Sequence, residues 1–501
     1  MRVSATSGGV GLRSERGPVL LGVMLSTALV AIDATVIATA VPSVVAELGG
    51  FSQFPWLFSA YLLAQAVTVP VFGKLADVFG RKPVMLVGIG LFLVGSVLCG
   101  AAWSMESLIV FRAVQGLGAG AVQPMSMTII GDVYSVAERA KVQGYVASVW
   151  GVSSVVGPTL GGVFSEYTSW RWIFYINIPL CLVAAAAIGW RFDEQRGRRT
   201  GQDGDEPGRK RRAPLDLLGA SVLTVALTLL VLGVLEGGQA WPWASVPGVG
   251  VLVADALLLG VFVLVERRAA DPVVPLHLLR RRLIVTTSAA SACIGAVLLA
   301  LTSYVPTFVQ VSLGAGPLVA GFALAALTIG WPISASQSGR VYLRVGMRTT
   351  AVVGAVVVLG GCALLLPLGS SSSVLAVAGA SFAIGLGMGL TAAPTLIAAQ
   401  AAVGWGERGV VTGLSMFARS AGSAVGIAVF GAVVNASLGG RSAEGAGVAP
   451  GELADAVHLV FLGVLALAVV LLVAVVLMPK DRPAPRSSGQ PDPDGDLQAS
   501  T

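Results

Sequence analysis

The chain has 501 residues, of which 55% are apolar and only 12% charged, and its mean hydropathy is +0.84. Soluble domains carry about a quarter of charged residues, so a soluble fold is excluded. The apolar residues come in blocks of about 20, enough for a helix to cross ~30 Å of hydrocarbon. Strands of a transmembrane β-barrel would instead alternate apolar and polar residues over about ten positions. We therefore predict an all-α membrane protein.

Apolar blocks bounded by glycine, proline or charge predict fourteen transmembrane helices in chain order. The seventh and eighth stand between two sets of six. The predicted spans are residues 19–41, 56–73, 83–102, 107–130, 143–165, 171–190, 215–236, 247–265, 284–305, 318–337, 349–368, 373–395, 410–436 and 457–478. Only Gly369 and a run of serines separate the eleventh span from the twelfth, so a different count is conceivable there.

The positive charges predict the orientation. If the N-terminus is cytoplasmic and the spans alternate, 28 of the 32 Lys and Arg residues fall on the cytoplasmic side. Arg171 and Arg441 fall outside, and Arg112 and Arg419 fall within spans. This asymmetry follows the positive-inside rule, and it places both termini in the cytoplasm of a multi-pass protein of the cell membrane. It also accounts for the basic pI of 9.3 without a nucleic-acid partner.

The polar segments predict the domain boundaries. A cytoplasmic tail (1–18) precedes a bundle of six helices (19–190), and a charged, glycine-rich linker (191–214) follows it. The additional helices (215–265) and a cytoplasmic loop (266–283) lead to a second bundle of six (284–478). The linker and the tail 479–501 have the composition of disordered segments.

An internal repeat supports this division. The loop 73–82 (GKLADVFGRK) and the loop 339–348 (GRVYLRVGMR) share two glycines seven positions apart and a basic end, at an offset of 266. The triplets 116–120 (GLGAG) and 385–389 (GLGMG) match at an offset of 269. These matches occur in the same order along both halves and at nearly the same offset, which indicates two related bundles.

Charged and polar side chains inside the spans are the candidates for function. A carboxylate at mid-bilayer costs roughly 2.5–3.5 kcal/mol on insertion scales. Asp33 is therefore either a site for protons or a cationic substrate, or a static ion-paired group. Arg112 needs an anionic or carbonyl partner, with Gln115 and Gln123 on the same helix. Arg419 is a further candidate for substrate binding or coupling.

Two other segments carry candidate residues. Gly157, Pro158, Gly161 and Gly162 allow close helix packing and a bend in the fifth span, which fits either generic packing or alternating access. In the loop 73–82, Gly73, Asp77, Gly80 and Arg81 form either a plain basic anchor or a cytoplasmic latch with Asp77 against a helix N-terminus.

Groups for other kinds of chemistry are missing from the sequence pattern. Cys99, Cys181, Cys293 and Cys362 lie in apolar blocks without a CxxC pair, and His277 and His458 are far apart. We find no catalytic constellation, metal-ligand cluster or phosphate-binding loop. The sequence thus predicts neither an enzyme nor a cofactor.

The motifs resemble those of a known family. The loop 73–82 resembles the signature loop of the major facilitator superfamily, 112–116 (RAVQG) its fourth-helix motif, and 157–162 (GPTLGG) its antiporter motif. Asp33 and the residues up to Pro42 look like the first-helix motif of the fourteen-helix drug:proton antiporters, and 170–179 (WRWIFYINIP) is similar to a stretch typical of them. Leu343 departs from the pattern, because it replaces the acid of the second-half loop.

The resemblance implies alternating access between two bundles, with proton influx driving drug export. By position, Asp33 and Arg112 would serve proton coupling, Asp77 and Arg81 the latch, and Gly157 and Pro158 the bend. The substrate would be a lipophilic or cationic small molecule, with Tyr145, Trp150, Tyr304 and Phe308 as plausible lining residues or as ordinary packing. A metabolite importer of the same fold and a non-transporting membrane sensor remain the alternatives.

Overall fold

We analysed a computed structural model of the chain. It describes residues 11–49, 53, 56–192, 216–236, 241–242, 245–269, 272–369, 371–437 and 450–480. Most of the predicted linker 191–214 and of the tails 1–18 and 479–501 therefore lies outside the described residues.

The described part is helical throughout its apolar segments, and a helix lies at each of the fourteen predicted positions. The N-terminal bundle contains α1 (Gly17–Leu48), α2 (Trp56–Phe79), α3 (Arg81–Gly100), α4 (Met105–Val133), α5 (Val136–Tyr167), α6 (Trp172–Tyr175) and α7 (Asn177–Arg191). The additional pair is α9 (Leu217–Glu236) and α10 (Val246–Glu266). The C-terminal bundle contains α11 (Arg282–Ser312), α12 (Pro317–Val345), α13 (Met347–Leu365), α14 (Val374–Ala401), α15 (Arg408–Ser437) and α16 (Pro450–Val476), with the short turns η2 (Leu278–Arg280) and η3 (Trp405–Glu407).

Eleven helical segments of the described chain are long and apolar enough to cross a membrane. The helices α4 and α5, which carry several glycine and polar residues, fall outside this set, and α9 contributes only a shorter apolar stretch, Leu218–Leu230. The predicted sixth span is divided into α6 and α7. The structure therefore supports a polytopic helical membrane protein, and the crossing of the bilayer by all fourteen segments stays a prediction.

Local sequence signals define the ends of these helices. Ser104 caps α4 in a reciprocal pair with Ser107, and Ser135 caps α5 in the same manner with Glu138, which satisfies free backbone N–H groups. Gly80 between α2 and α3 has φ 102°, and Gly346 between α12 and α13 has φ 89°. Glycine adopts this conformation without a Cβ penalty. These two turns lie at the repeat offset of 266, and the chain turns in the same way in both halves.

The glycine triplets hold the bundles together through equivalent contacts. A Cβ at Gly118 would lie 2.7 Å from the carbonyl oxygen of Gly88, and one at Gly387 would lie 2.6 Å from that of Gly354. These glycines let α4 pack closely on α3 and α14 on α13. The pairs correspond through the repeat, so the same small-residue packing builds both bundles.

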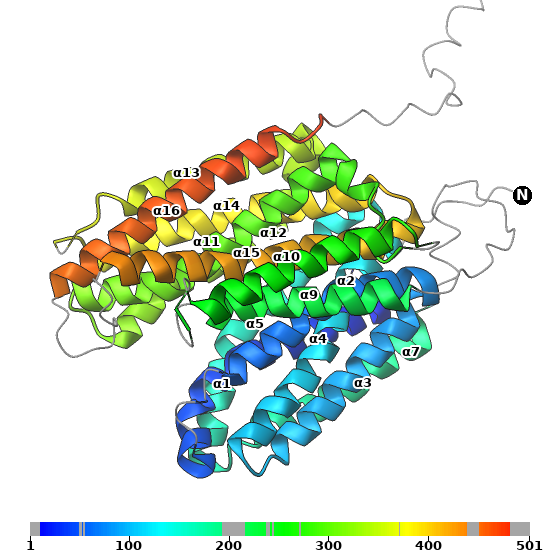
Figure 1. The fold of residues 1–501 in the computed structure, drawn as a ribbon, viewed down its shortest axis with the longest axis horizontal. Helices are drawn as coiled ribbons and strands as arrows, with labels where there is room; N and C mark the ends of the chain where they lie inside the picture. Colours follow the sequence, from blue (N-terminus) through cyan, green and yellow to red (C-terminus); the bar gives the residue numbers. More distant parts are fainter. Residues whose placement is uncertain are drawn as a thin grey trace, which may run out of the picture.

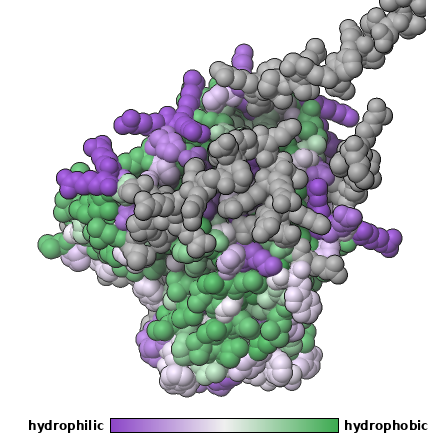
Figure 2. All heavy atoms as spheres, turned by 90° about the vertical axis from the view of Figure 1, so that its right-hand side faces the viewer, coloured by the Kyte–Doolittle hydropathy of each residue, from purple (hydrophilic) through white to green (hydrophobic). Residues whose placement is uncertain are grey.

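The two bundles meet at one end of the molecule and diverge toward the other (Figure 1). The α9–α10 pair lies along the side of α2 and α15. We call the end at which the bundles meet the basic end, because it carries Arg81, Arg139, Arg344, Arg348 and Arg408. Figure 2 looks onto this end and shows hydrophilic side chains projecting around it above apolar flanks. The other end is called the opposite end below.

Candidate functional site

A buried ion pair joins α1 to α4 inside the N-terminal bundle. Nη1 of Arg112 lies 2.7 Å from Oδ2 of Asp33, and each of the two residues is 1% exposed. Nε of Arg112 also donates to the carbonyl oxygen of Leu57 at 3.1 Å, and its guanidinium lies 4.2 Å from the centre of the Tyr61 ring. The structure thus brings together the two residues that the sequence singled out for proton coupling.

Gln115 completes this cluster. Its side-chain oxygen accepts from Nη1 of Arg112 at 2.7 Å, and its Nε2 donates to Oδ1 of Asp33 at 2.9 Å. The same Nε2 donates to the hydroxyl of Ser96 at 2.8 Å. Gln115 lies one turn after Arg112 on α4, so both point toward α1. Both carboxylate oxygens of Asp33 are therefore hydrogen-bonded while the charge is unscreened by solvent.

This arrangement makes the position of Arg112 dependent on the charge of Asp33. An ionised carboxylate balances the guanidinium in a region of low dielectric. A protonated carboxyl no longer balances it, because arginine keeps its proton.

The glycine motif of α5 lies beside this cluster. A Cβ at Gly157 would lie 2.9 Å from Cβ of Thr35, whose hydroxyl also contacts the carbonyl oxygen of Ser153 at 3.1 Å. Gly157 thus permits close contact between α5 and α1 two residues from Asp33. Gly161 is buried and Gly162 has open space beside it. The backbone of Pro158 lies in α5, and its side chain lies outside the described residues.

Asp77 forms the contact between the bundles at the basic end. Its Oδ1 accepts from the backbone N–H of Gly409 at 3.1 Å, and its Oδ2 from that of Val410 at 2.9 Å. These N–H groups belong to the first turn of α15, where the helix dipole favours a negative charge. A Cβ at Gly73 would lie 2.6 Å from the carbonyl oxygen of Gly409, so glycine is required for this approach. Asp77 is placed against a helix N-terminus, as the sequence led us to expect for a latch.

Arg81 extends this contact into a network. It pairs with Asp77 at 2.9 Å and with Asp132 at 2.8 Å, and its guanidinium lies 3.5 Å from the centre of the Trp405 ring. Asp132 also pairs with Arg408 of α15 at 3.1 Å. Sequence reasoning missed Asp132, Trp405 and Arg408. Asp132 was the detectable one, because it is the acid that ends the apolar run of α4.

The second seam between the bundles, α5 against α12, has weaker polar contacts. The hydroxyl of Tyr342 donates to the carbonyl oxygen of Val136 at 2.7 Å. The next residue, Leu343, replaces the acid expected by symmetry and is 52% exposed. The two seams are therefore chemically unequal, and the carboxylate contact to a helix N-terminus occurs at α2–α15.

The other candidate residues are dispersed. Gln123 accepts from Nε2 of Gln65 at 2.8 Å, which ties α4 to α2. Tyr145 packs against the core of the N-terminal bundle, and Trp150 is 36% exposed. Tyr304 is half-buried against the core of the C-terminal bundle.

Phe308 requires a correction. We considered it as a lining residue, but it is 0% exposed and stacks edge-on against Phe461 and His458, with centroid distances of 5.4 and 5.5 Å. It is a core residue, because its ring fills the space between α11 and α16. An aromatic residue in an apolar helix does not reveal from sequence alone which side it faces.

Arg419 lies on α15 beside a small cavity of about 30 Å³ that Ser291, Ile294, Ala392, Leu396, Ser415 and Met416 also line. Within the described part of the chain its guanidinium has no hydrogen bond or ion pair. The sequence identified the residue, and the structure shows that it is not the counterpart of Arg112 in its contacts.

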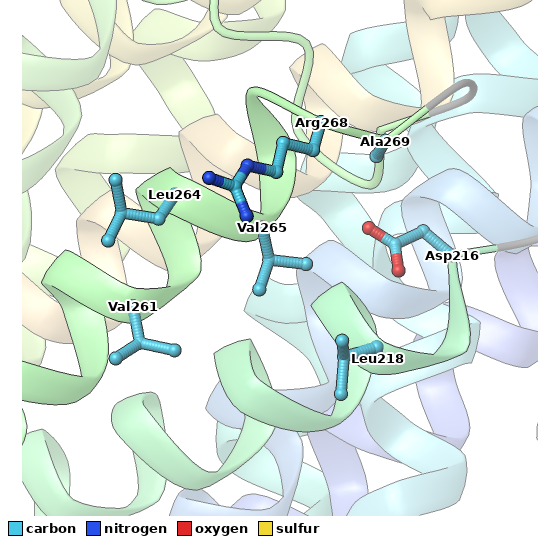
Figure 3. A pocket seen from close by; sticks show the side chains of 7 residues that line it. All are labelled: Asp216, Leu218, Val261, Leu264, Val265, Arg268 and Ala269. Atoms are coloured by element: carbon cyan, nitrogen blue, oxygen red, sulfur yellow. The ribbon is translucent and has the colours of Figure 1, made fainter.

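A larger cavity lies away from these residues, on the α9–α10 pair. It has a volume of about 360 Å³, with Leu218, Val261, Leu264 and Val265 along it and Asp216 and Arg268 at its polar end (Figure 3). Asp255, further along α10, is 5% exposed. The cavity opens at the side of the molecule and not between the bundles, so we do not assign it to the Asp33 cluster.

A second polar contact fixes the N-terminal bundle at the opposite end. Glu47, beyond the apolar part of α1, pairs with Arg171 and accepts from Nε1 of Trp170 at 2.7 Å. Arg171 also donates to the carbonyl oxygen of Ala102 at 3.1 Å. The hydrogen bonds from Arg171 and Trp170 hold the pKa of the Glu47 carboxyl below its usual value. This contact joins α1 to the segment before α6.

Comparison with known proteins agrees with this architecture. Residues 23–427 match the family described as Major Facilitator Superfamily. The chain is 33% identical over 431 residues to the multidrug transporter protein MdtP of Bacillus subtilis, covering 86% of this chain and 77% of that protein. It is 31% identical over 415 residues to multidrug resistance protein 3 of Bacillus subtilis, covering 83% and 79%. It is also 30% identical over 420 residues to the efflux pump FUS6 of Gibberella fujikuroi, covering 83% and 75%.

A solved structure shares the fold. The human organic anion transporter MFSD10 (TETRAN) superposes with a TM-score of 0.60 at 17% identity, covering 93% of this chain and 99% of that one. The fold of two bundles that meet at a glycine-rich seam and the buried Asp–Arg pair are consistent with this family. The match to the family model covers most of the length of the chain. The chain is a membrane transporter that belongs to the Major Facilitator Superfamily.

Proposed function

We propose that the protein exports lipophilic small molecules from the cell in exchange for protons, as a fourteen-helix drug:proton antiporter. The observation that carries the proposal is the buried pair of Asp33 and Arg112, with both side chains 1% exposed and 2.7 Å apart. An ionisable pair inside a membrane bundle is costly, which makes it a candidate for proton coupling.

The coupling of proton and substrate movement would follow from the charge of Asp33, which differs between its ionised and protonated forms. Asp33 holds α1 to α4 when it is ionised, and releases Arg112 and Gln115 when it binds a proton. A transporter that moves the substrate in one state and the proton in the other converts the proton gradient into export. Moving one charge through 100 mV supplies ~2.3 kcal/mol, to which a pH gradient adds.

The proposed orientation assigns the side of the membrane toward which the transporter is closed. By the positive-inside rule the basic end faces the cytoplasm, and both chain termini lie on that side of the cell membrane. The described hydrogen bonds and ion pairs between the bundles lie at this end, among them those of Asp77, Asp132 and Tyr342. With this orientation, these contacts would close the transporter toward the cytoplasm, and a bound compound would exchange with the outside.

The relatives support the type of substrate. Two bacterial relatives are named for multidrug transport or resistance, and a fungal one is named an efflux pump. We extend this to the present chain as export of drug-like or antibiotic-like compounds. A metabolite importer of the same fold would move its substrate in the opposite direction, so the direction of flux separates the two functions.

The proposal is tested with inverted membrane vesicles that are acidified inside and supplied with ethidium. We expect the wild type to accumulate the dye, and Asp33→Asn to reduce pH-driven accumulation at least tenfold. Asn cannot take up or release the proton, so pH-independent exchange of labelled for unlabelled ethidium should persist in this variant.

Two further variants keep the test interpretable. Asp33→Glu retains a titratable carboxyl in case the neutral side chain prevents folding, since an unpaired buried Arg112 costs about 3–5 kcal/mol. It should retain part of the pH-driven uptake. Asp255→Asn removes another carboxylate of a membrane helix and should leave uptake unchanged. Full pH-driven uptake by Asp33→Asn would remove this residue from the mechanism, and efflux from the inverted vesicles would indicate an importer.

A further inference from the structure

Among the described residues of the C-terminal bundle, one cation lies in the middle of a helix, and its side chain is half-buried. Arg419 lies eleven residues after the start of α15 at Arg408, which corresponds to about 16 Å along the helix axis and hence the middle of the hydrocarbon layer. The other charged side chains of the described helices α11 to α16 lie within two turns of a helix end. Arg419 therefore contributes an isolated positive charge at the depth expected for a transported compound.

Arg419 differs from Arg112 in having no anion. Arg112 is neutralised by Asp33 and fixed by Gln115 and a carbonyl oxygen. Arg419 has no acid, amide or carbonyl partner within the described part of the chain, and its side chain is half-buried in the middle of a membrane helix. A guanidinium in such a place needs an anionic or carbonyl partner, because arginine does not lose its charge.

The surroundings of Arg419 contain hydrogen-bond donors. Ser291 on α11 and Ser415 on α15 line the same cavity of about 30 Å³. Neither hydroxyl makes a hydrogen bond within the described residues. The remaining lining is apolar, with Ile294, Leu396 and Met416. Three donors without partners thus converge on one opening with an apolar wall.

We propose that Arg419 binds an acidic group of the transported compound, so that the substrates include lipophilic carboxylates or similar organic anions. The guanidinium fork matches the two oxygens of a carboxylate, and the hydroxyls of Ser291 and Ser415 donate to the same group. The apolar wall contacts the adjacent part of the molecule. This inference rests on the proposed export function and names the substrate class of the same transporter.

The placement also distinguishes the roles of the two bundles. The carboxylate of Asp33 in the N-terminal bundle is occupied by Arg112, so it is not available to a cationic substrate in this state. The unpaired charge is the positive one, in the C-terminal bundle. Proton coupling and substrate recognition then reside in different halves of the molecule.

The test uses a fluorescent xanthene dye with a free carboxylate and the ethyl ester of the same dye. Binding to the purified protein in lipid nanodiscs is measured by fluorescence anisotropy at constant pH. We expect the wild type to bind the acid more tightly than the ester. Arg419→Gln should weaken binding of the acid about tenfold or more, which corresponds to ~1.4 kcal/mol, and leave binding of the ester within twofold.

Three variants complete the design. Arg419→Lys retains the charge and should retain part of the preference for the acid. Ser415→Ala should reduce that preference without changing the affinity for the ester, and it tests the site even if Arg419→Gln fails to fold. Arg344→Gln removes an exposed arginine at the basic end and serves as the matched control, with no change for either dye.

The outcomes separate this inference from the proposed function. A wild type that binds the acid no more tightly than the ester overturns the inference, as does equal loss of both dyes in Arg419→Gln. Carboxylate-selective binding without pH-driven transport of either dye would leave the Arg419 site intact and overturn the antiporter. Uptake of ethidium driven by pH without carboxylate-selective binding would support the antiporter and overturn the Arg419 site.

Discussion

At the scale of single residues, two arginines inside the membrane solve the same electrostatic problem in different ways. Arg112 is held by Asp33, Gln115 and the carbonyl oxygen of Leu57. Arg419 faces a cavity with two unbonded hydroxyls. A buried charge must be compensated within the protein or by a ligand. We therefore expect Arg112 to govern coupling and Arg419 to govern which compounds bind.

The geometry at Arg112 predicts the effect of a change that preserves charge. Arg112→Lys keeps a cation, but a compact ammonium does not reproduce the planar fork that reaches Asp33, Gln115 and Leu57 together. We expect pH-driven export in vesicles to fall about tenfold or more, with the protein still folded by gel filtration. Turnover equal to that of the wild type would show that Arg112 is only structural.

Glu47 predicts a dependence of stability on pH. The pKa of its carboxyl is lowered in the folded protein by Arg171 and Trp170, so the folded state favours the ionised form. The contribution is complete above the usual pKa of about 4.3 and is lost as the pH falls through the lowered value. The difference in Tm between the wild type and Glu47→Gln should be constant from about pH 7 to 5 and disappear on further acidification. A difference that grows on acidification would contradict this.

Sequence-based expectation and structure agree for single residues whose charge requires a partner inside the membrane. The sequence indicated that Asp33 and Arg112 each need a partner, because charges in lipid must be compensated, and the structure shows that they pair with each other. The contacts of Asp132 with Arg408 and of Arg81 with Trp405 were not predicted, because contacts between bundles depend on the conformational state. Phe308 failed as a lining residue, since an apolar helix of this kind gives no signal for which face is buried.

At the scale of elements, the internal repeat could be recognised in the sequence because its glycines are needed for turns and for close contacts between helix backbones. Gly80 and Gly346 occupy equivalent turns with positive φ, and the triplets of α4 and α14 pack on equivalent neighbours. The spacing of glycine in apolar sequence therefore predicted two related bundles, and the structure adds that these glycines form the turns and the helix contacts. The division of the sixth span into α6 and α7 was not predicted, although Asn177 and Pro179 interrupt the apolar run where it occurs.

The approach of α2 to α15 predicts the effect of a single methyl group. Gly73→Ala places a Cβ 2.6 Å from the carbonyl oxygen of Gly409, and such overpacking costs about 1–3 kcal/mol. We expect the basic end to open, with longer distances between spin labels at Lys141 and Arg344. Gly360→Ala is the control, because its Cβ would meet nothing within 4 Å. Identical distances in both variants would show that the seam tolerates the methyl group.

At the scale of the whole molecule, the fold is two bundles in contact at one end (Figure 1). The superfamily and the polytopic architecture were accessible from motifs and hydropathy. The conformational state was not, because alternative states share one sequence and differ only in which contacts between bundles are made. The network of Asp77, Arg81, Asp132 and Arg408 supplies that information.

Rigid-body exchange between states predicts reciprocal motion at the two ends. The native cysteines Cys99, Cys181, Cys293 and Cys362 are buried, so labels can be introduced elsewhere. Asp77→Ala removes two hydrogen bonds to α15 and an ion pair. We expect distances between labels at Lys141 and Arg344 to lengthen, while those between labels at Trp103 and Ser371 shorten. Lengthening at the basic end without shortening at the other would refute rocking of intact bundles.

The inequality of the two seams has a consequence for access to the transporter. Separating α2 from α15 breaks two hydrogen bonds to a carboxylate and an ion network, and the α9–α10 pair packs along this side. Separating α5 from α12 breaks a neutral hydrogen bond from Tyr342. The bundles should therefore separate first between α5 and α12, on the side that the α9–α10 pair does not cover. If the basic end faces the cytoplasm, as proposed, compounds dissolved in the inner leaflet would then enter laterally and from one side only.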